Sequence, residues 1–112
     1  MTEKFLKNDK EKPGFELLPL ELFSEVNDVL RFGAKKYGSP LNWKKKEGFK
    51  YSRAYNALLR HMLAWRNGEN LDPETGLCHL SHAMCNLLFL MYHFKYNKEA
   101  DDRPKEVDNE KV

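Results

Sequence analysis

Two histidines near the start of the last predicted helix are the residues best suited to chemistry. His79 and His82 are three residues apart, so in a helix they lie on one face, followed one turn later by Asn86. The residues around them are apolar or small, and burying polar groups without partners costs about 1–3 kcal/mol each. Folding alone does not require this many histidines, so we interpret His79 and His82 as metal ligands or proton carriers. His93, far along the same helix, is interpreted as structural.

The loop before these histidines supplies carboxylates. Hard cations such as Mg²⁺ and Mn²⁺ bind carboxylate oxygens, and Mn²⁺ also accepts imidazole. The alternative is ordinary loop chemistry, because Asp72-Pro73 favours a turn and acids near a helix N-terminus are favourable in any case. We predict a Mg²⁺ or Mn²⁺ site whose candidate ligands are Glu69, Asp72, His79 and His82.

A second acidic group lies on the first predicted helix. Glu21, Glu25 and Asp28 are spaced by four and three residues, which places them on one helix face. Such acids can hold Mg²⁺, but an amphipathic helix also presents acids of this kind to water. The sequence leaves open whether these three residues join the metal site.

The segment from Arg31 to Arg53 is strongly basic. It holds eight Lys or Arg residues and a single acid, Glu47. Such a segment attracts an anion, either a nucleotide phosphate or a nucleic acid, unless it is simply a solvated loop. An asparagine amide can read a purine edge, a tryptophan can stack on a base, and arginine suits bidentate phosphate contacts. The predicted substrate contacts are Lys36, Tyr37, Asn42, Trp43, Arg60 and Asn86.

The elements that position these residues are predicted to be helices. Apolar residues recur at helical spacing in three segments, and no segment shows a convincing strand alternation. The expected fold is therefore an all-α small helical bundle, and a domain of this size gains stability from a homo-oligomer that shares its core. We predict helices over 19–36, 52–67 and 77–95, within a body at 13–96 between flexible tails at 1–12 and 97–112.

Composition narrows the class of protein. The net charge of +2 is small, and there is no P-loop and no glycine-rich dinucleotide fingerprint. Cys78 and Cys85 would lie roughly 10 Å apart on one helix, too far for a disulfide, which indicates reduced thiols and a cytoplasmic protein. No apolar run is long enough to span a membrane, and no signal peptide is expected.

Several strings together resemble the dATP/dGTP diphosphohydrolase family, which is common in tailed phages. The resemblance covers about residues 13–94 and implies hydrolysis of dGTP or dATP to a monophosphate and pyrophosphate, in the host cytoplasm. It also suggests kinship with the all-α MazG-like pyrophosphohydrolases, which use Mg²⁺ or Mn²⁺ and assemble as oligomers. The strings are Phe32-Gly33-Ala34-Lys35-Lys36-Tyr37-Gly38, Asn42-Trp43, Ala57-Leu58-Leu59-Arg60-His61, Glu74-Thr75-Gly76-Leu77 and His79-Leu80-Ser81-His82-Ala83.

The chain departs from the MazG-like pattern at the metal site. MazG-like enzymes hold metal with a Glu-x-x-Glu helix and a Glu-x-x-Asp helix, and no Glu-x-x-Glu string occurs in the predicted helices. His79-x-x-His82 takes the second position. Either the ligand shell is rebuilt around these histidines, with or without Glu21 or Glu25, or the kinship is looser.

In the expected mechanism a metal-activated water attacks phosphorus and pyrophosphate leaves. His61 or His79 handles the proton, because imidazole titrates near neutral pH. Nucleic acid is not the expected partner. The alternatives are a non-catalytic phage nucleic-acid-binding protein that uses the basic segment, and a helical interaction module whose histidines only satisfy hydrogen bonds in the core.

Overall fold

The computed structural model describes residues 8, 10–12 and 14–105, and over these residues the chain is helical. They contain no strand, and their one β-bridge joins Leu71 to Cys78. The all-α prediction is therefore confirmed. The elements are α1 (Phe23–Tyr37), α2 (Tyr51–Arg66) and α3 (His79–Tyr96), with short 3₁₀ helices at Leu20–Leu22, Asn42–Lys44 and Lys98–Ala100.

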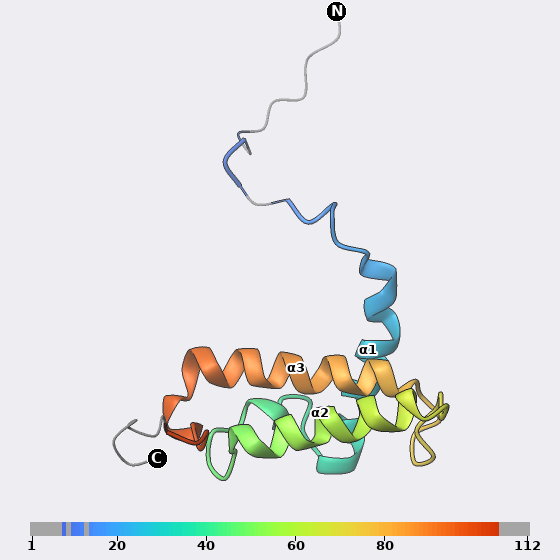
Figure 1. Ribbon diagram of the computed structural model, residues 1–112. Helices are drawn as coiled ribbons and strands as arrows, with labels where there is room; N and C mark the ends of the chain where they lie inside the picture. Colours follow the sequence, from blue (N-terminus) through green and yellow to red (C-terminus); the bar gives the residue numbers. More distant parts are fainter. Residues whose placement is uncertain (1–7, 9, 13, 106–112) are drawn as a thin grey trace, which may run out of the picture.

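The three helices form an antiparallel pair crossed by a third helix. α2 and α3 lie side by side along most of their lengths, joined by the loop that follows Arg66 (Figure 1). α1 packs against α3 and has little direct contact with α2. The loop between α1 and α2 returns to α3 through the 3₁₀ helix Asn42–Lys44. α3 is thus the central element, and a space remains between α1 and α2.

Local sequence explains most of the helix boundaries. α1 ends at Tyr37, and its C-cap is Gly38, which adopts a left-handed φ of 73° that favours glycine. Ser52 is a residue type that often caps helices, but α2 begins one residue earlier, at Tyr51, and Ser52 lies in its first turn. Instead the backbone N–H and the hydroxyl of Ser52 both donate to the carboxylate of Asp102.

The interior is small and partly polar. Val26 and Val29 of α1 pack against Cys85 of α3, which is 1% exposed. His79 and His93 on α3 are also buried. Apolar spacing on this helix predicts a core line of Leu80, Met84, Leu87, Leu88 and Met91. Only Leu88 packs against the core, whereas Leu80, Met84, Leu87 and Met91 are 38–61% exposed, because no other part of the described chain covers them.

The packed part of the chain extends past the boundary predicted at residue 96. Asn97 and Ala100 are buried, and Asp102 holds the start of α2 through Ser52. Most of the predicted N-terminal tail and the end of the C-terminal tail lie outside the described residues. Among the described helices, none has the length and apolar character needed to cross a bilayer.

Candidate functional site

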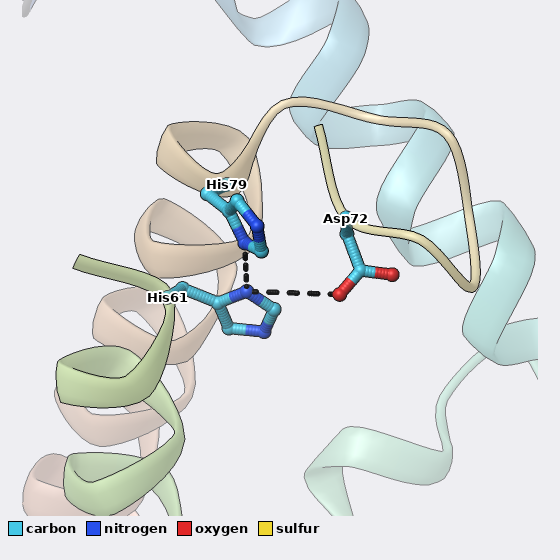
Figure 2. A group of neighbouring side chains, drawn as sticks. All are labelled: His61, Asp72 and His79. Carbon is cyan, nitrogen blue, oxygen red and sulfur yellow. Dashed lines mark hydrogen bonds and ion pairs between the residues drawn. The ribbon is translucent and has the colours of Figure 1, made fainter. Parts of the chain in front are cut away.

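The centre of the candidate site is a cluster of two histidines and an aspartate. His61 comes from the second half of α2, His79 opens α3, and Asp72 lies in the loop between them (Figure 2). The Nδ1 atoms of His61 and His79 are 2.9 Å apart, and His61 Nδ1 is 4.0 Å from Asp72 Oδ2. One ligand atom from each residue lies within 4.8 Å of the others. The antiparallel pairing of α2 and α3 creates this cluster, because it brings the end of one helix beside the start of the next.

The geometry of the cluster suits a divalent cation. Ligand atoms of an octahedral cation, at 2.0–2.1 Å from the metal, lie roughly 3 Å apart, so only a small closing movement is needed here. His79 Nε2 is buried and has no hydrogen-bond partner, and its nearest carboxylate oxygen, on Glu69, is 3.7 Å away. A buried polar atom without a partner costs free energy unless something else binds it. The donor set of two imidazoles and a carboxylate is typical of Mn²⁺ and other transition metals rather than of Mg²⁺.

The electrostatics keep the imidazoles of His61 and His82 neutral and the carboxylate of Asp72 charged. Partial burial lowers the pKa of His61, and the neighbouring His82 lowers it further. Burial is also the main reason that the pKa of His82 is lowered. Burial alone would raise the pKa of Asp72, but hydrogen bonds from the backbone N–H groups of Thr75 and Glu74 hold it below its usual value. At neutral pH the imidazoles of His61 and His82 are therefore uncharged, the form that binds a cation or accepts a proton.

The two carboxylate oxygens of Asp72 have different partners: one stabilises the turn and the other faces the cluster. Oδ1 accepts the backbone N–H groups of Glu74 and Thr75 at 2.9 and 3.0 Å, which closes the predicted turn. Oδ2 faces His61. The turn and the metal-ligand interpretations of this residue are thus compatible.

The other two predicted ligands lie beside the cluster rather than in it. His82 stacks on His61 with ring centroids 4.5 Å apart, and its Nε2 shares a hydrogen bond of 2.7 Å with the Thr75 hydroxyl. The Glu69 side chain is half exposed and approaches His79 only at 3.7 Å. The prediction expected His82 as a ligand of the cluster, but His61 takes that place. From the sequence, His61 was expected to transfer a proton.

The acids of the first helix do not come together at the cluster. Glu25 reaches α3 instead, where its Oε1 accepts the backbone N–H of Cys78 at 2.6 Å and the Ser81 hydroxyl at 3.2 Å. Glu21 and Asp28 are exposed. Glu25 therefore caps the N-terminus of α3, which holds His79 in place from a distance.

A cavity of about 500 Å³ lies between α1, α2 and the loop that joins them, and His61, Asp72 and His79 are not among its lining residues. Two lining residues connect it to the cluster along the helices: Arg60 directly precedes His61 on α2, and the Asn86 amide donates to the His82 carbonyl on α3. Five of the six predicted substrate contacts line this cavity, namely Tyr37, Asn42, Trp43, Arg60 and Asn86.

The sixth predicted contact, Lys36, lies outside the cavity lining. Its Nζ forms an exposed ion pair with Glu74 at 3.1 Å, and this partner raises the pKa of the lysine. Because Glu74 follows Asp72 by two residues, the pair places a cation near the histidine cluster. The Lys36 Nζ also lies 5.6 Å from the centre of the Tyr37 ring, which lines the cavity.

His93 holds the aromatic wall of the cavity. It is fully buried and stacks on Phe49, with ring centroids 3.6 Å apart. Its Nδ1 accepts a hydrogen bond from the Asn97 amide. The ring proton is therefore on Nε2, which donates to the Trp43 carbonyl at 2.7 Å. The Trp43 ring in turn stacks on Phe89, with centroids 5.3 Å apart. The structural interpretation of His93 agrees with these contacts.

Sequence reasoning missed several cavity residues. Phe49, Phe89 and Gly33 line the cavity, and so does Arg53, which stands two turns before Arg60 on α2. The aromatic content of the 37–51 loop was a signal for Phe49, and the seven-residue spacing of the two arginines was a signal for Arg53. The role of Gly33 had no signal beyond its position inside a helix.

Taken together, the fold and the site define a small helical domain with a candidate cation cluster beside an aromatic and basic cavity. The model of the family described as dATP/dGTP diphosphohydrolase, N-terminal, matches residues 2–103, and the chain belongs to this family. It is similar to a protein of Salmonella phage PMBT28 named dATP/dGTP diphosphohydrolase, with 35% identity over 98 residues. That match covers 88% of this chain and 32% of the relative, so the chain spans about a third of the relative's length. No solved structure matches the chain.

Proposed function

We propose that this chain hydrolyses deoxypurine nucleoside triphosphates to a monophosphate and pyrophosphate with the help of a divalent cation. The observation that carries the proposal is the cluster of His61, Asp72 and His79 beside a cavity that suits a base. The name of the phage relative supports the choice of dATP and dGTP. Because the chain matches only about a third of that relative, its own activity has to be tested directly.

The phosphates are proposed to bind at the histidine end of the site. A divalent cation held by the cluster would neutralise phosphate charge and activate the attacking water. Arg60 and Lys36 add positive charge on two sides, and arginine suits bidentate contact with phosphate oxygens. Mn²⁺ is the preferred candidate and Mg²⁺ the second, because Mg²⁺ favours an all-oxygen shell.

The base is proposed to enter the cavity. Trp43 offers a stacking surface that is already fixed by Phe89, while Asn42 and Asn86 offer amides for the polar edge of a purine. Asn86 follows His79 by seven residues, which is about 10 Å along a helix axis. This distance suits a ligand that places its phosphates at one end and its base at the other.

His82 is proposed as the proton acceptor. From the sequence we predicted this role for His61 or His79, but both of these residues belong to the cluster whose nitrogens suit a cation. His82 lies against His61, outside the cluster, and burial keeps its imidazole neutral at neutral pH. The Thr75 hydroxyl fixes the ring through Nε2. A neutral, oriented imidazole of this kind can accept the proton of the attacking water.

The test is turnover of dGTP and dATP with Mn²⁺ or Mg²⁺, measured as release of pyrophosphate and monophosphate. Asp72→Asn keeps an oxygen for the turn but removes the charge that faces His61. We expect it to lower kcat at least about 100-fold, since even partners outside a ligand shell contribute about 10–100-fold. Asp28→Asn, at an exposed acid of α1, is the matched control and is expected to retain full activity.

A second readout does not depend on turnover. Mn²⁺ at about a hundred times its Kd is expected to stabilise the wild-type fold by about 2.7 kcal/mol, seen as a higher Tm. Asp72→Asn is expected to lose this shift. Orthophosphate as the product, or no turnover with either cation, contradicts the proposal. Oligonucleotide binding with steep salt dependence and no turnover would favour the nucleic-acid alternative.

A further inference from the structure

Small residues line the cavity on both of the helices that flank it. Gly33 and Ala34 on α1, with Ala54 and Ala57 on α2, belong to its lining. The two helices pack mainly against α3 rather than against each other, so the space between them is not closed by large side chains. The residue types at these positions therefore set how wide the cavity is.

The requirements of folding do not explain why position 33 is a glycine. It lies inside α1, eleventh of fifteen residues, and it is not among the glycines with positive φ. A methyl group added there would meet no other atom within 4 Å. A glycine inside a helix costs about 0.5–1 kcal/mol relative to alanine. Neither backbone conformation nor crowding requires glycine, and helix stability opposes it.

The surroundings of Gly33 indicate what the open space accommodates. Leu30 and Tyr37, one turn to either side on α1, both line the cavity, so Gly33 leaves a notch between two large side chains. The Trp43 ring of the same cavity is held by Phe89 and Tyr92 and has little freedom to widen it. A fixed aromatic wall and a notch in the neighbouring helix suit a flat, extended ring system.

We propose that Gly33 determines substrate size at this site, by leaving room for the two fused rings of a purine base. The inference rests on the proposed function and adds the residue that selects purines over pyrimidines. A methyl group at this position narrows the notch. A two-ring purine base then no longer fits the cavity, whereas a single-ring pyrimidine base still does. A mismatch of one methyl group in a shaped pocket is worth about tenfold or more in discrimination.

The test is the variant Gly33→Ala, with kcat/KM measured for dGTP and dCTP and with Tm measured in parallel. We expect a fall of about tenfold for dGTP, chiefly through KM, and little change for dCTP. The Tm is expected to stay equal or rise, because alanine favours the helix. Asn27→Ala, at an exposed position of the same helix, is the control that improves helix propensity and leaves selectivity unchanged.

Binding measurements separate this inference from the proposed function. The affinities for dGMP and dCMP, followed by quenching of tryptophan fluorescence, report on the cavity even if the protein turns over no triphosphate. A preference for dGMP that is lost in Gly33→Ala supports the inference. A folded Gly33→Ala protein whose preference for dGMP over dCMP stays within twofold of wild type overturns it. Gly33→Ser provides a second variant with the same expected direction.

Discussion

Replacing His93 with alanine is expected to destabilise the protein more than any other change at a histidine. The ring is fully buried and fills the space between Phe49 and the end of α3. Its two nitrogens bind the Trp43 carbonyl at 2.7 Å and the Asn97 amide at 3.0 Å. The imidazole therefore ties the loop that carries the cavity wall to the central helix.

The magnitude follows from what the substitution removes. Truncating a large buried ring to alanine costs about 3–5 kcal/mol through lost packing and the cavity that remains. Each buried polar group left without its partner adds about 1–3 kcal/mol, although relaxation and water entry offset part of this. We expect the free energy of unfolding to fall by about 4 kcal/mol, most of the stability that a small domain possesses.

The measurement is urea denaturation followed by circular dichroism and by tryptophan fluorescence. The emission of His93→Ala is expected to shift to longer wavelength, because Trp43 loses the contact that fixes its loop. Lys95→Ala, at an exposed position two residues later on α3, is the control and should stay close to wild type. A loss below 1 kcal/mol in His93→Ala, with an unchanged spectrum, would refute the reasoning.

Two further predictions concern the packing of α1 against α3. Burial raises the pKa of the Cys85 thiol to about 12, and the side chain is 1% exposed, so a thiol reagent should label the native protein only at Cys78 and label both cysteines after unfolding. Fast labelling of both thiols in the native state, counted by mass spectrometry, would contradict the packing of α1 on α3. Glu25→Ala removes the carboxylate that caps α3, and its unfolding free energy in urea should fall by about 0.5–2 kcal/mol. The exposed Glu21→Ala serves as control, and equal stability of the two variants would exclude the cap.

The exposed apolar line on α3 bears on the prediction of a homo-oligomer. Leu80, Met84, Leu87 and Met91 recur at helical spacing and stay open to solvent in the single chain. A stripe of this kind on a helix commonly packs against another element. The homo-oligomer stays a prediction, and analytical ultracentrifugation of the full chain would measure it.

Local sequence determined the elements of this protein. Apolar spacing and the absence of strand alternation predicted three helices, each within a few residues of its observed bounds. The spacing of His79 and His82 also fixed their shared face, because three residues on a helix are nearly one turn. The reduced state of both cysteines followed from the same geometry and agrees with the structure.

Tertiary packing decided which of the chemical residues meet. His61 and His79 are 18 residues apart, and only the antiparallel pairing of α2 with α3 brings their nitrogens to 2.9 Å. Glu25 was one of three equivalent acids by sequence, yet the crossing of α1 over α3 turned it into a helix cap. Spacing within one helix is set by the local backbone, whereas contacts between helices depend on how whole faces pack. Asp72 and His79 could therefore be predicted from sequence as candidate ligands, while the entry of His61 into the cluster and the formation of the cavity could not.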